Sequence, residues 1–413
     1  MTVTDFPNQT DFRADLDRNE KGILRHHIAN TMTMMRNDPD WLGVLAYDEF
    51  RQEVILLKPF PRHDGYVETN FKPRPITDTD ITAAHEWFCL DNFPNVPREN
   101  IIHALQAAAK ENSFHPVRDY LRSLSWDGIE RLYEWLSTYC GARHRNSIEL
   151  EYIQTVATKS LIAAVARVMS PGCKADHVPI IEGRQGIGKS TALLILAGED
   201  WFSDNLPHDL TCKDAKDHLR GVWIIELPEL GQLQKHEVEI IKAFITRREE
   251  KYRPAYGRFE IVYPRQCVFF GTTNSATYLR DDSGNRRFWP VHCDPAGGMI
   301  DLDGLVRDRD QLWAEAVACF DAGELWHFTD AAVIEEATRQ QAERYADDVW
   351  ESKVLSYANG NEKFTTGDVL RNALDVETPR QDRAGQNRVA AILRSNGFES
   401  GRRSSRGRLW VRV

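Results

Sequence analysis

The sequence predicts an α/β protein with a parallel central sheet. From residue 177 to about residue 295, short apolar segments alternate with helical segments, which is the pattern of parallel strands joined by crossover helices. A glycine-rich turn connects the first apolar segment to a helix, and two later apolar segments end in polar or acidic side chains. In such sheets, ligands bind outside the carboxyl ends of the strands, so the sequence predicts a binding site at that edge.

The glycine-rich turn carries the most specific motif in the chain. From Gly183 to Ser190 it fits the pattern G-x4-G-K-[ST], with an apolar strand before it and an apolar helix after it. Main-chain N–H groups of such a turn can wrap a phosphate, while Lys189 reaches the β and γ phosphates and Ser190 ligates Mg²⁺. The alternative is a chance glycine-rich turn. We therefore predict ATP and Mg²⁺ as cofactors, held by Gly183, Gly186, Gly188, Lys189, Ser190 and Thr191.

Two further strands supply the polar groups that a triphosphate site needs. The apolar segment 221–225 is followed by Glu226 and Glu229, and the apolar segment 267–270 leads to Asn274. We expect Glu226 to hold the Mg²⁺-bound water, and either Glu226 or Glu229 to polarise the attacking water. Asn274 is expected to orient that water or to sense the γ-phosphate. Taken alone, each segment would also suit a solvated strand end.

A pair of arginines follows the third strand. Arg286 and Arg287 stand directly after a Gly-Asn turn, from which they can reach outward. A permanent charge and a planar fork suit a γ-phosphate in its transition state. If the subunits form a ring, one of these arginines can serve the nucleotide of the neighbouring subunit. The alternative is a surface salt bridge.

A basic and aromatic segment lies between the second and third strands. Residues 247–265 hold six basic side chains, three acidic side chains and three tyrosines, and Gly257 indicates a hairpin turn. Such a hairpin can grip a single strand through phosphate charge and base stacking. The alternative is an exposed hairpin with tyrosines in the core. The predicted DNA contacts are Lys251, Arg253, Tyr256, Arg258 and Arg265.

The C-terminal tail and the overall charge complete the predicted domain organisation. From residue 348 the pattern reads three helices and a strand pair, a winged-helix-like order, and six arginines fall in the last twenty residues. This tail is a local basic patch in a chain whose net charge is −10. The predicted divisions are a disordered N-terminus at 1–20, a small α/β connecting domain at 21–112, a helical domain at 113–172, an ATPase core at 173–330, a helical linker at 331–347 and the winged-helix-like domain at 348–413.

Cysteine usage and hydropathy indicate the compartment. The seven cysteines form no C-x-x-C pair, which argues against a zinc ribbon and a disulfide framework. No apolar run approaches the length of a membrane span, and no signal peptide is visible. We expect a cytoplasmic protein with no membrane partner.

The order and spacing of these motifs resemble the virulence-associated protein E family, which belongs with superfamily 3 helicases and is similar to poxvirus-type primase-helicases. The resemblance covers most of the chain. The segments that carry it are His115-Pro-Val, Trp126-Asp127-Gly128, 182–191, 223–230, Tyr252-Arg253, Tyr256-Gly257, 272–274, 285–289 and 309–316.

The resemblance implies a P-loop NTPase core of AAA+-like type, a hexameric ring and translocation on single-stranded DNA. It places the basic hairpin in the ring channel and makes Arg286 or Arg287 a finger that acts in trans. The function implied is an ATP-dependent DNA helicase, acting on single-stranded or forked DNA in the replication of a phage or integrated mobile element in a bacterial host.

The sequence does not predict a primase module, and it leaves two alternative functions open. Residues 1–112 show no carboxylate cluster suited to polymerisation, so we expect no primase module here and a separate primase as partner. The alternative functions are a replication initiator that melts an origin without processive unwinding, and a regulatory or defence ATPase.

Overall fold

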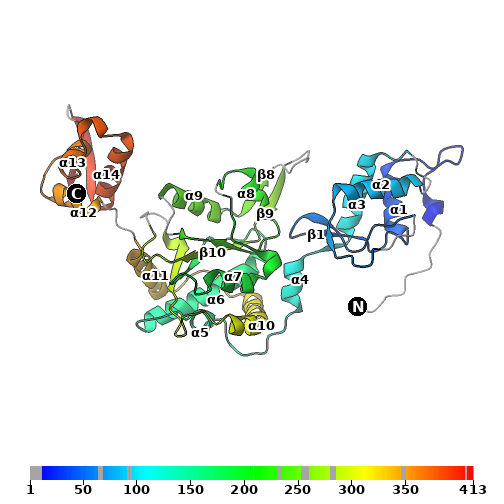
Figure 1. The fold of residues 1–413 in the computed structure, drawn as a ribbon, viewed down its shortest axis with the longest axis horizontal. Coiled ribbons are helices and arrows are strands. Elements are labelled where there is room, and N and C mark those ends of the chain that lie inside the picture. Colours follow the sequence, from blue (N-terminus) through cyan, green and yellow to red (C-terminus); the bar gives the residue numbers. More distant parts are fainter. Residues whose placement is uncertain are drawn as a thin grey trace.

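The structure is a computed structural model whose described residues form three parts along the chain, with four apolar clusters as their cores. The first lies near the N-terminus, a large middle part surrounds the central sheet, and the last lies at the C-terminus. Figure 1 shows the first and last parts at opposite ends of the middle part. The structure describes residues 12–63, 68–90, 93, 95–207, 209–230, 235–252, 260–279, 285–345, 350–404 and 407–412.

The N-terminal part is a small sheet covered by helices. Its strand order is β3-β2-β1-β4, in which β1 pairs antiparallel with β2 and parallel with β4. Apolar residues of the helices and of β1 and β2 form its core, including Met34, Phe88 and Leu105. The elements are α1 (Ile28–Asn37), β1 (Leu45–Asp48), β2 (Glu53–Leu56), β3 (Arg74–Pro75), α2 (Asp78–Leu90), α3 (Arg98–Glu111) and β4 (Ser113–Phe114).

The predicted disorder at the N-terminus does not extend through residues 12–20. Leu16 is buried in the N-terminal core, and the main-chain N–H of Asp17 donates to Asn30 Oδ1 at 2.8 Å. The side chain of His27 lies 2.8 Å from the Asp17 carboxylate. The buried leucine and the hydrogen bonds between Asp17 and Asn30 hold this segment against α1. Residues 1–11, which are also predicted to be disordered, lie outside the described residues.

The middle part contains the parallel sheet that the alternation of segments predicts, so the α/β class is confirmed. The strand order is β11-β5-β10-β7-β6, and every neighbouring pair is parallel. Its elements are α4 (Pro116–Ser123), α5 (Trp135–Thr138), α6 (Ser147–Met169), β5 (Val178–Glu182), α7 (Lys189–Ala197), β6 (Phe202–Ser203), α8 (Lys213–Asp217), β7 (Ile224–Leu227), α9 (Lys235–Thr246), β8 (Glu249–Tyr252), β9 (Ile261–Pro264), β10 (Val268–Thr273), β11 (Phe288–His292), α10 (Leu302–Asp321) and α11 (Ala331–Glu343).

Both faces of this sheet are buried, which explains why its strands are apolar throughout. Ile224 and Phe270 point into the cluster that α6, α7 and α10 close, whereas Ile225 and Phe269 point into the cluster that α9 closes. Figure 1 shows α8 and α9 on one side of β10 and α6, α7 and α10 on the other. α11 packs on α6 and β11, so residues 331–343 join the body of the middle part.

The register of the sheet sets which residues meet at each edge. Phe270 lies opposite Glu226, Thr273 lies opposite Glu182, and Phe288 lies opposite Val178. The carboxyl ends of β5, β7 and β10 therefore share one edge of the sheet. The amino ends of β5 and β11 lie at the opposite edge, and we call this the arginine edge because Arg286 and Arg287 precede β11 there.

A turn of the N-terminal part inserts into the middle part. Phe50, between β1 and β2, is fully buried in the cluster around α6, and its ring lies 5.2 Å from the ring of His115. Its carbonyl oxygen accepts hydrogen bonds from the Tyr263 hydroxyl (2.9 Å) and from the main-chain N–H of Gly221 (3.2 Å). The two parts are therefore joined by packing as well as by the chain.

The C-terminal part has the predicted order of three helices followed by an antiparallel strand pair. Phe364, Leu393 and Trp410 contribute to its own apolar cluster. The elements are α12 (Glu351–Asn359), α13 (Thr366–Asn372), α14 (Arg383–Ser395), β12 (Phe398–Ser404) and β13 (Gly407–Arg412).

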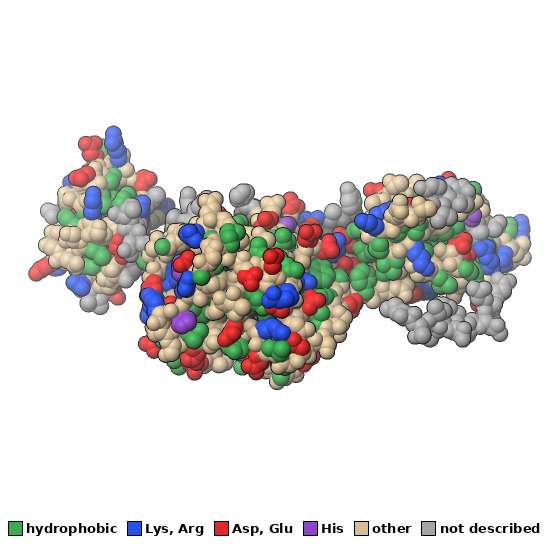
Figure 2. Space-filling model, turned by 60° about the horizontal axis from the view of Figure 1, so that its bottom comes forward, with side chains coloured by type: hydrophobic (Ala, Val, Ile, Leu, Met, Phe, Trp, Pro, Cys, Tyr) green, Lys and Arg blue, Asp and Glu red, His purple; other side chains and the backbone are tan. Residues whose placement is uncertain are grey.

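The surface shown in Figure 2 mixes acidic, basic and apolar side chains, as the modest net charge leads one to expect. Within the described residues, none of the helices is both long enough and apolar enough to cross a bilayer.

Candidate active site

The loop between β5 and α7 requires glycine at specific positions. Gly186 and Gly188 adopt φ values of +80° and +100°, which L side chains rarely adopt. At Gly183, an added Cβ would lie 2.5 Å from the carbonyl oxygen of Cys293. The loop thus closes tightly over the end of β5 and leads directly into the N-terminus of α7, where anions are favoured.

Lys189 lies inside this loop. Its Nζ donates to the carbonyl oxygens of Gly183 (2.8 Å) and Arg184 (2.9 Å) and to Oδ1 of Asn274 (2.7 Å). Burial lowers the pKa of the ammonium group, and the negative charge of Glu229 partly opposes that shift. The lysine predicted from the loop and the asparagine predicted from β10 are therefore in direct contact.

Glu226 lies at the end of β7 and is 1% exposed. Its Oε1 accepts hydrogen bonds from the hydroxyl of Ser190 at 2.7 Å and from that of Thr272. Its Oε2 is buried and has no hydrogen-bond partner among the described residues. A buried carboxylate oxygen that lacks a donor, beside a serine hydroxyl, fits a small divalent cation with oxygen ligands.

Glu229 differs from Glu226 in exposure and in backbone conformation. It is exposed, and its φ of +52° is uncommon for a residue other than glycine. Asn274 Nδ2 donates to its Oε1 at 3.0 Å. Asn274 thus connects Glu229 to Lys189, so that one amide contacts both a carboxylate and an ammonium group at the mouth of the loop.

A pocket of about 460 Å³ opens beside the loop and is lined by Gly183, Arg184 and Asn274. Behind it, the buried Glu182 accepts a bidentate pair of hydrogen bonds from Arg344 (2.8 and 2.9 Å) and one from the Tyr278 hydroxyl. Sequence analysis missed the other residues of this lining because no local motif marks them. They are Arg143, Arg145, Glu149, Glu182, Ser275, Ala276, His292, Glu343 and Arg344.

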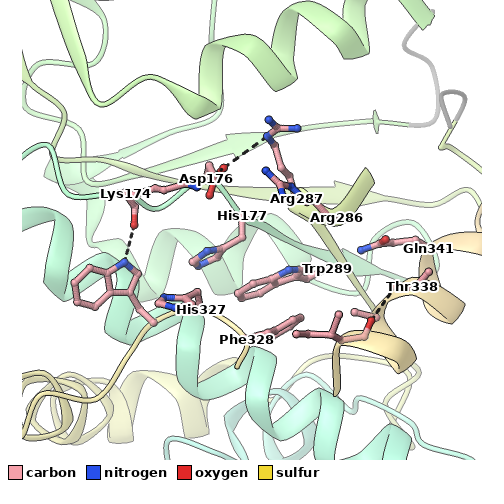
Figure 3. Close-up of a pocket in the computed structure, with 13 residues that line it drawn as sticks. Lys174, Asp176, His177, Arg286, Arg287, Trp289, His327, Phe328, Thr338 and Gln341 are labelled. Carbon is pink, nitrogen blue, oxygen red and sulfur yellow. Dashed lines mark hydrogen bonds and ion pairs between the residues drawn. The ribbon is translucent and has the colours of Figure 1, made fainter. Parts of the chain in front are cut away.

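The structure does not bring the two predicted arginines to the loop. Arg286 and Arg287 lie at the arginine edge, while the loop lies at the carboxyl edge, and the five residues of β5 separate the edges by roughly 15 Å. Arg287 Nε donates to Thr246 Oγ1 at 3.0 Å, and Asp176 lies 3.8 Å from Arg287 (Figure 3). Arg286 is exposed.

The basic hairpin is formed by β8 and β9, which pair antiparallel. Lys251 is exposed and lies 3.6 Å from Glu260. The prediction that Arg265 contacts DNA is wrong, because its guanidinium is fully buried and donates to Glu250 and to the carbonyl oxygen of Phe244. The predicted contacts Arg253, Tyr256 and Arg258 lie outside the described residues.

The fold and this site define a mixed α/β protein with a glycine-rich loop at the carboxyl edge of a parallel sheet. The family model of the virulence-associated protein E-like domain matches residues 121–347, which is more than half of the chain. The chain therefore belongs to the virulence-associated protein E-like domain family, and the resemblance drawn from its motifs is confirmed.

Solved structures similar to this chain include three of the C-terminal region of NrS-1. One, titled the A form apo structure of the region 305–718, has a TM-score of 0.44, 10% sequence identity, and covers 89% of this chain and 96% of that chain. The other two are apo structures with TM-scores of 0.47 and 0.46 and 11% identity, each covering 89% of this chain and 95% of that chain. No curated protein matches the chain.

Proposed function

We propose that this protein is a P-loop NTPase with an AAA+-like core that hydrolyses ATP with Mg²⁺ and couples hydrolysis to movement along single-stranded DNA. This is the activity of a replicative DNA helicase of a phage or integrated element. The observation that carries the proposal is the meeting of two strand ends and the first turn of α7 at one buried carboxylate. Ser190 on α7 and Thr272 on β10 both donate to Glu226 on β7, and no described residue donates to Glu226 Oε2.

Some residues of the site would bind the metal ion, and others would bind the phosphates. Ser190 and Glu226 would hold Mg²⁺, whose charge would neutralise the phosphate oxygens. Lys189 would exchange the loop carbonyls for the β and γ phosphates, which are stronger acceptors because they are charged. The glycines of the loop would direct main-chain N–H groups toward the same phosphates.

Glu229 is the better candidate for polarising the attacking water. Glu226 is buried, and its Oε1 is already engaged by two hydroxyls. Glu229 is exposed at the mouth of the loop, where the Asn274 amide orients its carboxylate. An exposed, oriented carboxylate can accept a proton from water. We therefore assign the role of general base to Glu229 and the role of metal ligand to Glu226.

Arg286 is the better candidate for a finger that acts in trans. Both arginines lie across the sheet from the loop, so neither reaches the nucleotide of its own subunit. Arg287 is held by Thr246 and Asp176, whereas Arg286 is exposed. In the hexameric ring that the family resemblance implies, Arg286 of one subunit would meet the nucleotide of the next.

The chain also offers a direct connection between DNA and nucleotide. Residues 265–267 connect β9 of the basic hairpin to β10, and Asn274 directly follows β10. Lys251 supplies exposed positive charge on the partner strand β8. A shift of the hairpin along DNA would therefore act through one strand on the amide that contacts Lys189 and Glu229.

Strand displacement on forked DNA tests this proposal. The wild-type protein should separate the strands with ATP and Mg²⁺, and Lys189→Ala should abolish both hydrolysis and displacement while thermal unfolding stays unchanged. Hydrolysis without displacement would favour an initiator or a regulatory ATPase. Normal turnover by folded Lys189→Ala would remove the proposed site.

A further inference from the structure

A cluster of three buried side chains lies directly behind the glycine-rich loop. Glu182 ends β5, Tyr278 follows β10, and Arg344 follows α11. Glu182 is 5% exposed, and its carboxylate accepts hydrogen bonds from Arg344 on both oxygens (2.8 and 2.9 Å) and from the Tyr278 hydroxyl (2.6 Å). We call these three residues the carboxylate cluster. Segments that are distant in sequence therefore meet at one carboxylate.

Main-chain hydrogen bonds join the same segments. The carbonyl oxygen of Arg344 accepts a hydrogen bond from the main-chain N–H of Tyr278 at 2.9 Å. The main-chain N–H of Gly183 donates to the carbonyl oxygen of Thr273, at the end of β10, at 3.2 Å. Residues 274–277 are therefore held at both ends, by the glycine-rich loop at one end and by the carboxylate cluster at the other.

The carboxylate cluster adjoins two of the groups that contact Lys189. Lys189 Nζ donates to the carbonyl oxygen of Gly183 at 2.8 Å and to Oδ1 of Asn274 at 2.7 Å. Gly183 directly follows Glu182 in the chain. Asn274 begins the short segment that Tyr278 anchors to Glu182. The cluster therefore sets how far apart the two acceptors of Lys189 lie.

The charges of the carboxylate cluster compensate one another. A lone carboxylate beside this loop would repel a triphosphate, and the bidentate contact with Arg344 neutralises the Glu182 charge. Burial raises the pKa of Tyr278, so its hydroxyl keeps its proton and donates at neutral pH. A buried ion pair is also weak evidence for a gain in stability, because desolvation offsets the attraction of the two charges. The effect of the cluster on the site is therefore one of geometry.

We propose that the carboxylate cluster positions Asn274 for ATP hydrolysis by holding the segment 274–279 against the glycine-rich loop. The inference rests on the proposed function, in which the Asn274 amide contacts both Lys189 and Glu229. Tyr278 is 1% exposed and is not part of the described lining of the pocket beside the loop. Its hydroxyl therefore acts on a bound nucleotide only through neighbouring groups, which makes Tyr278 the residue to test.

A double-variant cycle in the full-length protein tests this role. Tyr278→Phe removes one hydroxyl and leaves both contacts between Glu182 and Arg344 in place. The kcat of ATP hydrolysis should fall about tenfold, because a small displacement of Asn274 misorients the groups around the phosphates. Affinity for a fluorescent, non-hydrolysable ATP analogue should stay within about twofold. In an Asn274→Ala background, Tyr278→Phe should lower kcat no further, since the group that it positions is gone.

Tyr152→Phe is the matched control. Tyr152 is also 1% exposed, and its hydroxyl donates to the carbonyl oxygen of Pro290 at 3.0 Å. Each variant loses one buried hydroxyl, so thermal unfolding should report similar losses of stability, whereas kcat should fall in Tyr278→Phe alone.

Three results would overturn the positioning role and leave the proposed function standing. They are a wild-type kcat in Tyr278→Phe, an equal fall of kcat in both tyrosine variants, and an undiminished effect of Tyr278→Phe in the Asn274→Ala background. A wild-type protein that does not hydrolyse ATP would instead remove the proposed function, and the positioning role with it.

Discussion

Glu226 and Glu229 stand three positions apart, yet their surroundings differ in ways that divide their roles. Glu226 ends a buried strand and accepts two hydroxyl hydrogen bonds on one oxygen. Glu229 lies just outside the strand, exposed and in a left-handed conformation that a non-glycine residue keeps only when its surroundings enforce it. The strained backbone places its carboxylate within reach of the Asn274 amide.

Glu229→Gln should lower the kcat of ATP hydrolysis on the order of 10²–10⁴-fold, because the amide cannot accept the proton of the attacking water. Affinity for the ATP analogue should stay within about twofold. Steady-state hydrolysis and equilibrium binding measure the two quantities. Glu239→Gln, an exposed glutamate on α9, is the matched control. A Glu229→Gln protein with wild-type kcat would transfer the base role to another group.

Arg344 shows a second effect at the residue scale. It is 8% exposed, and it holds the carboxylate of Glu182 just before the loop glycine Gly183. Arg344→Met should cost about 3–5 kcal/mol of unfolding free energy, because it leaves a buried carboxylate without its cation. The double variant Glu182→Gln/Arg344→Met should lose less, since no uncompensated charge remains. Urea unfolding measures both, and equal losses would mean that the pair contributes through packing alone.

At the scale of elements, the strands β9 and β10 lie between the proposed DNA contact and the proposed nucleotide site. The base of the hairpin is fixed in the core, where the Arg265 guanidinium lies 4.7 Å from the Phe244 ring and pairs with Glu250. Among the described residues of β8, Lys251 keeps an exposed cationic side chain. A base that is fixed in the core suits the proposed transmission of displacement from the hairpin to the end of β10.

Lys251→Ala should reduce the stimulation of ATP hydrolysis by single-stranded DNA several-fold and leave hydrolysis without DNA unchanged. The lost phosphate contact should also lower the slope of log affinity against log salt by about one. Hydrolysis assays with and without an oligonucleotide, together with a salt titration of binding, provide the measurements. Lys72→Ala is the control, and equal stimulation in the two variants would remove Lys251 from the DNA contact.

At the scale of the whole molecule, local patterns predicted the parallel sheet and part of the site. The strand–glycine loop–helix motif is continuous in sequence, and the strand ends at Glu226 and Asn274 follow from burial, so these residues could be placed near one another in advance. The structure brings Lys189, Asn274 and Glu229 into one chain of hydrogen bonds. Their chemical roles stay predictions.

The rest of the fold and of the candidate site depends on contacts between segments that are distant in sequence, and hydrophobic periodicity does not reveal such contacts. Arg344 reaches Glu182 from 162 positions away, and His115 contacts Gln266 from 151 positions away. Arg265 was misassigned because a basic residue in a basic segment looks exposed until its partner across the hairpin, Glu250, is seen. Charge composition alone therefore could not separate the exposed residues of the hairpin from its buried base.

The burial of Phe50 in the middle part affects how stable a truncated form of this protein would be. The family match begins at residue 121, but the apolar cluster around α6 includes the side chain of Phe50, which precedes the matched residues. Cutting at 121 would leave a hole the size of a phenyl ring, a change that costs about 3–5 kcal/mol in other cores, and would strip the Tyr263 hydroxyl of its acceptor. A fragment that keeps the β1–β2 turn should therefore be more stable than one that begins at residue 121, although that turn lies outside the matched residues.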